Sequence, residues 1–342
     1  MRTKHAVTLT LTLALGLAAG GARANDSTAE LATGGLVFVK NDAIQMLAED
    51  LFVSATEIKV RYRFFNRSAQ DVTVHVAFPM PDIKVDGPDQ NIAVPTEDPV
   101  NLLGFSTTVN GAPVRTDVEQ RVTGADGVDR TALLRRLGVP LAPHLEATGA
   151  ALDRLPKDKW DELLKLDLAY VDEYDAGKGM ERHLAPRWSL KTTFYWQQIF
   201  PARGETVIEH RYTPSVGASV QTSLGAPSMA RDPEIVAHIK RYCIENDLLA
   251  TLERARKTAK AEFGPPYSEQ RIDYVLSTGA NWSGPIRDFR LVVDKGDPDS
   301  LISFCGTGVQ KIGPTTFEMR KTDFTPTGDL SVLILKKIKP PP

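Results

Sequence analysis

The sequence has few of the residues that build common catalytic and metal sites. Of its 342 residues, two are cysteine and six are histidine. It contains no His-Glu-x-x-His motif, no close cysteine–histidine cluster, no Gly-x-Ser-x-Gly motif and no phosphate-binding glycine loop after a predicted strand. These absences argue against an enzyme, and no motif for a cofactor is present.

An excess of charge of either sign is also missing. The 41 basic and 43 acidic residues give a formal net charge of −2, without a basic stripe. Because nucleic-acid binding depends on clustered Lys and Arg side chains, this composition argues against a nucleic-acid partner. The hydrophobic content of 42% and the charged content of 25% are typical of a folded protein.

The one long apolar run lies at the N-terminus. Arg2 and Lys4 precede apolar residues 6–19, and the small-x-small sequence Ala-Arg-Ala ends just before Asn25. This is the pattern of a secretory signal peptide, and the run is short for a transmembrane helix. We expect residues 1–24 to be removed, which lowers the net charge to −5 because three basic residues and no acidic ones are lost. The mature protein is then expected to be periplasmic or secreted, in a Gram-negative bacterium; an uncleaved anchor is the alternative.

Export would place Cys243 and Cys305 in an oxidising compartment. A disulfide between them is expected there, and two separate buried thiols are the alternative. Such a bridge would close a long loop and stabilise the fold by about 4 kcal/mol on the chain-entropy model.

Two segments with alternating apolar and polar residues give the clearest fold signal. They cover residues 58–64 and 72–78, and a polar loop separates them. Period-two alternation predicts a strand in each segment. If Phe64 lies opposite Val72, the apolar faces are in register, so a hairpin is predicted.

Two further hairpins are predicted nearby. Asn110-Gly111 is typical of a two-residue turn and lies between alternating segments 105–109 and 112–118. Asn41-Asp42 suits a turn between strands at 36–40 and 44–54. The polar residues before Gly34 are expected to form a loose leader.

These residues carry a family resemblance. The order strand, FNRSAQDV, strand, FPMPD, loop, FSTTVNGAPV is similar to the vault and inter-alpha-trypsin type β-sandwich. The segments NDSTAELATGGLVF and RYRFFNRSAQDVTVHVAFPMPD resemble a bacterial secreted family known as domain of unknown function 4424. The resemblance implies a β-sandwich and brings no known activity. Vault-type domains often precede a von Willebrand A domain, but its metal-binding Asp-x-Ser-x-Ser signature is absent from this chain.

The rest of the chain alternates between helical and strand patterns. Apolar residues at helical spacing over 145–155, and Pro156 as a possible first helical residue, predict helices within 129–174. Asp232 and Asp247 are predicted caps of two later helices, the second running to Phe263. We therefore expect a mainly β, α+β protein, with an antiparallel β-sandwich. Its expected parts are a signal peptide (1–24), N-terminal sandwich strands (25–122), a helical insertion (123–189), further strands (190–225), a helical hairpin (226–266) and a C-terminal β-rich part (267–342).

Candidate sites are few. Residues 172–179 are acidic and then glycine-rich but do not fit the EF-hand template. Asp172, Asp175 and His183 are weak candidates for metal ligands, and a solvated loop after a helix is the alternative. Trp196 and Trp282 are candidate contacts for a sugar or protein ligand, although both also fit packing at the ends of the core.

The sequence therefore favours a secreted or periplasmic, non-catalytic interaction module. Its expected partner is an envelope protein or a cell-surface component. A metal-dependent hydrolase and a carbohydrate-binding envelope protein are the alternatives.

Overall fold

The computed structural model describes residues 26–32, 35–87, 93–175, 177, 179–262 and 264–338. The predicted signal peptide, residues 1–24, lies outside the described residues. No helix in the described part of the chain has the length and apolar character needed to cross a membrane. The fold is mainly β, as the sequence predicts.

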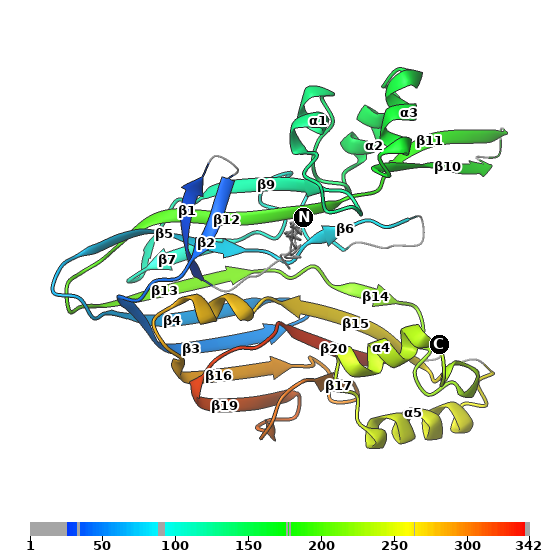
Figure 1. Ribbon diagram of the computed structural model, residues 1–342. Coiled ribbons are helices and arrows are strands. Elements are labelled where there is room, and N and C mark those ends of the chain that lie inside the picture. Colours follow the sequence, from blue (N-terminus) through cyan, green and yellow to red (C-terminus); the bar gives the residue numbers. More distant parts are fainter. Residues whose placement is uncertain are drawn as a thin grey trace, which may run out of the picture.

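Two large sheets face each other across the main core (Figure 1). The first has eight strands in the order β18-β19-β16-β3-β4-β13-β7-β8. Its strands are β3 (Ile44–Ser54), β4 (Ile58–Asn66), β7 (Ser106–Val109), β8 (Ala112–Pro113), β13 (Glu205–Tyr212), β16 (Ile286–Asp294), β18 (Gln310–Lys311) and β19 (Thr316–Phe324).

The second large sheet has the order β2-β1-β5-β12-β6, and β9 also pairs with β12. Its strands are β1 (Ser27–Ala32), β2 (Gly35–Val39), β5 (Val72–Pro79), β6 (Ile83–Lys84), β9 (Asp117–Thr123) and β12 (Ser189–Phe200). Each large sheet thus combines strands from the N-terminal segment with strands that come much later in the chain.

The alternation in β4 explains how the core forms. Val60, Tyr62 and Phe64 are at most 2% exposed, and the charged residues between them face outward. From the opposite sheet, the ring of Phe200 lies 5.7 Å from that of Phe64. Burial of such aromatic and aliphatic side chains between two sheets is the main stabilising contribution in a fold of this kind.

The predicted hairpin between β4 and β5 is wrong, although both strands form where expected. β4 pairs with β3 and β13, whereas β5 pairs with β1 and β12. Asn66 holds the crossing between the sheets, because its Nδ2 donates hydrogen bonds to the carbonyl oxygens of Gln70 (2.8 Å) and Phe200 (2.9 Å). The two apolar faces therefore meet across the core and do not lie side by side.

The other two hairpin predictions have different outcomes. Asn110 and Gly111 both have positive φ, 50° and 82°, and join β7 to β8 as the Asn-Gly signal predicts. The predicted second arm is divided, however, because β9 begins at Asp117 and pairs with β12 in the other sheet. The hairpin at Asn41-Asp42 is wrong, since β2 and β3 belong to different sheets.

The N-terminal segment is not a loose leader where the structure describes it. Residues 27–32 form β1, which pairs with both β2 and β5. Asp26, Ser27 and Thr28 are completely buried. Their polar groups find partners in the fold: the Thr28 hydroxyl, for example, donates to the Val39 carbonyl oxygen at 2.6 Å.

Three short helices and a two-stranded ribbon project from the body of the molecule (Figure 1). They are α1 (Thr131–Arg136), α2 (Glu146–Asp153), α3 (Lys157–Lys165), β10 (Ala169–Asp175) and β11 (Met180–Pro186). The sequence predicts helices within residues 129–174, which is wrong for the last part, because α3 ends at Lys165 and residues 169–175 form β10. Asp167 adopts a left-handed φ of 54° and ends the helical stretch, and the next residues pair with β11.

A smaller sheet and a helical hairpin form the C-terminal part. The sheet has the order β14-β15-β20-β17. Its elements, with the helices beside it, are β14 (Gly217–Ser219), η1 (Pro227–Met229), α4 (Pro233–Arg241), α5 (Asn246–Thr258), β15 (Tyr267–Tyr274), η2 (Ser277–Asn281), β17 (Leu301–Phe304) and β20 (Leu330–Lys337). One face of this sheet, including Ile272 and Val332, joins the main core. The other face, including Leu333 and Leu335, packs with the helices in a second core.

The helical hairpin is partly as predicted. Asp232 caps α4, and its Oδ1 accepts the backbone N–H of Glu234 at 2.8 Å. The second helix begins at Asn246, with Glu245 at the cap position instead of Asp247, and ends at Thr258. Lys260 has a left-handed φ of 51°, which stops this helix before Phe263.

Candidate functional site

A hollow of about 580 Å³ lies on the outer face of the eight-stranded sheet. We call it the charged groove. It lies over β3, β4, β7, β13 and β16, at positions whose neighbours along each strand point into the core. The charged side chains that line it are Asp50, Glu57, Lys59, Arg61, Glu209, Arg211 and Arg290.

Four of these residues form one row across four strands. The register places Glu209 opposite Arg61, Arg61 opposite Asp50, and Asp50 beside Arg290. Arg61 Nε lies 3.2 Å from Glu209 Oε1, and Arg290 Nη1 lies 3.0 Å from Asp50 Oδ1. The row therefore alternates in sign, with its charges fixed to a hydrogen-bonded sheet.

A second row places two cations opposite each other. Arg211 faces Lys59 in the register, which alone would be unfavourable. Glu57 resolves this, because its carboxylate lies 2.6 Å from Lys59 Nζ and also contacts Arg211. Partial burial raises the pKa of the Glu57 carboxyl, but the hydrogen bonds and charges of the two cations outweigh it and lower that pKa overall. Glu57 is therefore ionised at neutral pH.

The sequence predicts only part of this groove. The alternation of β4 placed Lys59 and Arg61 on a polar strand face, but their partners come from β3, β13 and β16. No local pattern shows which strand neighbours which. The outward charges in the strand at residues 286–294 were the signal that could have indicated a charged sheet face.

The ribbon of β10 and β11 holds the predicted metal candidates. Asp172 lies directly opposite His183, whereas Asp175 lies opposite Met180 at the end of the ribbon. The His183 ring is engaged elsewhere: Nδ1 lies 2.7 Å from Asp153 Oδ2, and Nε2 lies 3.3 Å from Glu181 Oε2. Within the described ranges, no group of three or more His, Cys, Asp or Glu side chains is arranged to hold a metal ion. The metal site stays a prediction from sequence.

His183 should make the ribbon sensitive to pH. Its hydrogen bonds to Asp153 and then Glu181 raise the pKa of the imidazole above its usual 6.5. The charged ring can donate to both carboxylates, whereas the neutral ring carries one N–H. The stabilisation is therefore complete below pH 6.5 and is lost as the pH rises through the folded-state pKa. We expect hydrogen exchange of amides 181–184, corrected for intrinsic rates, to be faster at pH 8.5 than at pH 5.5.

The control for this measurement is His183→Gln, which cannot titrate. In that variant the corrected exchange rates at the two pH values should be equal. Equal rates in the unmodified protein would contradict the assigned role of His183.

The two candidate tryptophans lie in the core. Trp196 is 3% exposed, and its Nε1 donates to Gln198 Oε1 at 3.3 Å. Trp282 is completely buried, and its Nε1 donates to the carbonyl oxygen of Asp26 at 2.6 Å. Neither indole offers a ring face to a ligand, so the structure does not support carbohydrate binding through these two residues.

A buried acid–imidazole pair lies between the two large sheets. His210 Nε2 is 2.9 Å from Asp26 Oδ1, and both side chains are completely buried. Nearby, the hydroxyl groups of Tyr62 and Tyr274 are 2.9 Å apart. Burial raises the pKa of Asp26, and the charge and hydrogen bond of His210 oppose that increase. The sequence does not predict this pair, because Asp26 lies in the segment expected to be loose.

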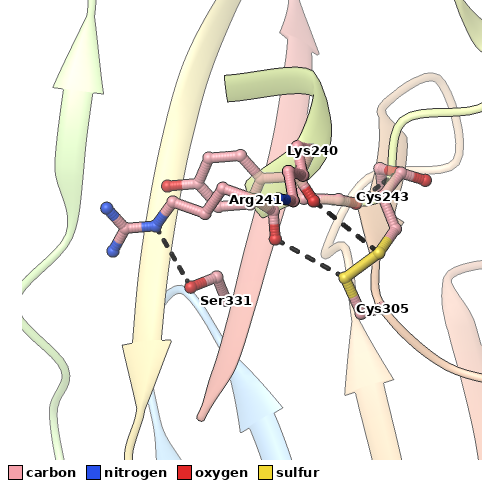
Figure 2. Close-up of a disulfide and its surroundings, with 7 residues drawn as sticks. Lys240, Arg241, Cys243, Cys305 and Ser331 are labelled. Carbon is pink, nitrogen blue, oxygen red and sulfur yellow. Dashed lines mark hydrogen bonds between the residues drawn. A yellow bond between two sulfur atoms is a disulfide. The ribbon is translucent and has the colours of Figure 1, made fainter. Parts of the chain in front are cut away.

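The predicted disulfide is confirmed (Figure 2). It joins Cys243, after α4, to Cys305, after β17, with the two Cα atoms 5.0 Å apart. Ser303 adds a second link, because its hydroxyl donates to the Tyr242 carbonyl oxygen at 2.9 Å. The bridge connects the end of α4 to the smaller sheet.

The fold defines a mainly β protein of two facing sheets, extended by a smaller sheet with a helical hairpin. The chain belongs to the family described as "Domain of unknown function (DUF4424)", whose model matches residues 24–333. This confirms that part of the resemblance; the likeness to the vault and inter-alpha-trypsin type sandwich stays a prediction.

Among curated proteins, none matches this sequence. Among solved structures, the chain is similar to a protein of Legionella pneumophila subsp. pneumophila str. Philadelphia 1 described as a "putative nutrient binding protein". The identity is 16%, the TM-score is 0.46, and the match covers 92% of this chain and 70% of that one. A similarity at this level supports no inference about the ligand.

Proposed function

We propose that this protein is a non-catalytic interaction module that acts outside the cytoplasm and binds an envelope protein or cell-surface component in the charged groove. The alternating row Glu209–Arg61–Asp50–Arg290 is the observation that carries the proposal. The N-terminal signal pattern and the disulfide support a periplasmic or secreted location.

The row is difficult to explain by stability alone. The side chains of Arg61 and Glu209 are 50% and 46% exposed, and ion pairs this exposed contribute only about 0–1 kcal/mol each. Charges of fixed sign and spacing are more useful for recognition, because they orient a charged partner and disfavour partners with the wrong pattern. A hollow over the row gives a partner's side chains room to enter.

The alternatives have less support from the described residues. A metal-dependent hydrolase would rely on His183, whose two ring nitrogens already face carboxylates. A carbohydrate-binding protein would rely on indoles that are buried. The groove, by contrast, combines exposure, a hollow and fixed charges.

A charge exchange tests the groove. In Arg61→Glu with Glu209→Arg, the cross-strand ion pair is kept but its polarity is reversed. We expect recovery of the partner to fall at least about tenfold, because the reversed charges at positions 61 and 209 would then face groups of the same sign on the partner. The measurement is crosslinking in the periplasm followed by quantitative mass spectrometry of proteins held by the wild type.

The same two strands provide a matched control outside the groove. Arg63 Nη2 lies 2.9 Å from Glu205 Oε2, with similar exposure, and neither residue lines the hollow. Exchange of this pair should leave recovery unchanged. An equal loss in both exchange variants, or no protein enriched by the wild type, would count against the proposed function.

A further inference from the structure

A second hollow, of about 280 Å³, lies where the end of the sandwich meets the C-terminal part. We call it the junction cleft. One wall comes from Pro81 and Asp82, which follow β5, and the other comes from α4 and β15. Ligand sites often form at such junctions between structural units. This cleft is distinct from the charged groove, with which it shares no lining residue.

The first wall presents an unsatisfied acid. Asp82 Oδ2 lies 3.0 Å from Lys191 Nζ. Its other oxygen, Oδ1, is buried and accepts no hydrogen bond from any described residue. Burial raises the pKa of Asp82, against the charge and hydrogen bond of Lys191. Because a buried carboxylate oxygen without a donor is costly, a ligand that brings a donor to this carboxylate would be stabilised.

The second wall carries the guanidinium group of Arg241, which is held in place by hydrogen bonds. Arg241 Nη2 donates to both oxygens of Asp273 at 2.8 Å. Its Nε donates to the Ser331 hydroxyl at 3.2 Å (Figure 2). Among the described residues, Arg241 Nη1 makes no hydrogen bond, so the guanidinium group keeps free N–H donors for a ligand. The side chain is 56% exposed, and the disulfide at Cys243 fixes the end of its helix.

A third group in the cleft is also unsatisfied. His238 Nε2 is buried, has no hydrogen-bond partner in the described part of the chain, and lies 3.4 Å from Glu269 Oε2. Burial lowers the pKa of this imidazole, although the charge of Glu269 opposes the change. The ring is therefore neutral at pH 7 and adds a polar contact without adding charge.

We propose that the junction cleft binds a small zwitterion of the α-amino-acid class, with its ammonium group at Asp82 and its carboxylate at Arg241. The cleft lining carries two guanidinium groups, on Arg241 and Arg271, and two carboxylates, on Asp82 and Asp273. A simple anion would leave Asp82 Oδ1 without a donor, and a simple amine would leave Arg241 Nη1 without an acceptor. A ligand with both groups satisfies both walls, and the small volume limits it to a compact molecule.

The direct test uses the mature protein with its disulfide intact. Each of the twenty standard amino acids is screened by isothermal titration, and the one that binds most tightly is compared with its deaminated acid and its decarboxylated amine. We expect the zwitterion to bind at least about tenfold more tightly than either analogue, because each analogue loses one charge-assisted hydrogen bond. Failure of all twenty to bind at millimolar concentration would overturn the proposal.

Two variants test which wall of the cleft binds the ammonium group and which binds the carboxylate. Asp82→Asn should weaken the zwitterion at least about tenfold but leave the affinity of the deaminated acid unchanged. Arg241→Lys keeps the positive charge but loses the paired N–H donors of the guanidinium group. It should weaken binding of both the zwitterion and the deaminated acid. Asp167→Asn serves as the matched control, because this exposed carboxylate pairs with Arg187 outside the cleft. Unchanged zwitterion affinity in both cleft variants, or a deaminated acid that binds as tightly as the zwitterion, would refute the assignment.

Discussion

Asp26→Ala is expected to destabilise the folded protein by about 3 kcal/mol, near the upper end of the cost of leaving a buried polar group without its hydrogen-bond partner. Asp26 Oδ1 lies 2.9 Å from His210 Nε2, and neither side chain is exposed. The alanine variant leaves the imidazole buried without its acid. The free energy of unfolding from urea denaturation, followed by tryptophan fluorescence, measures the effect.

The surroundings of His210 make this loss large. Its ring centre lies 4.6 Å from that of Phe78 and 5.1 Å from that of Phe105. The rings of Tyr62 and Trp196 are within 5.7 Å of it. Aromatic rings thus surround the imidazole on several sides. A buried imidazole without a partner is costly in such a site.

Two further variants separate the pair from the general effect of substitution. Asp26→Asn keeps the size and a hydrogen-bonding oxygen, so its loss should be smaller than that of Asp26→Ala. Asp42→Ala removes a carboxylate that is 86% exposed and should change stability by no more than about 0.5 kcal/mol. If Asp26→Ala were as mild as Asp42→Ala, the pair would not have the structural role assigned to it.

Removal of the disulfide should have an effect of similar size. The Cys243–Cys305 bridge spans a sequence separation of 62 residues. On the chain-entropy model, loss of a loop closure of this length lowers the free energy of unfolding by about 4 kcal/mol. The double variant Cys243→Ala with Cys305→Ala, compared with the oxidised wild type by urea denaturation, measures this.

The bridge should also have a local effect, because it fixes the end of α4. In the double variant, hydrogen exchange in α4 should increase more than exchange in the central strands β3 and β4. Wild-type protein with dithiothreitol is the control and should match the double variant. A loss of stability below about 1 kcal/mol would show that the smaller sheet and the second core hold this helix without the bridge.

The sequence was a good guide to where strands form and a poor guide to how they pair. The alternation in residues 58–64 and 72–78 predicted β4 and β5. Alternation reports which face of a strand is buried, and that face is the same in a hairpin and in two strands of opposite sheets. Only distant partners, such as β13 for β4, distinguish the two arrangements.

The sequence is likewise a poor guide to sites whose residues come from distant parts of the chain. The disulfide was predictable because two cysteines allow one pairing, and the pairing needs no register. Asp26 was misjudged because its polar neighbours suggest a loose segment, whereas His210 and Trp282, far along the chain, satisfy its groups. Asp82 and Arg241 had no sequence signal as a pair, because they come from different structural units and meet only through the fold.

The parallel pairing of β3 with β16 has a consequence for how the chain folds. Leu51 lies beside Leu291, so the largest sheet joins segments from opposite ends of the chain. A high contact order of this kind slows folding, because a long loop must close before its contacts form. The sheet cannot be completed while the C-terminal part is still being synthesised, and until then β3 keeps an open edge prone to pairing with other chains. A chain truncated after β13 should therefore aggregate and not fold as a smaller sandwich.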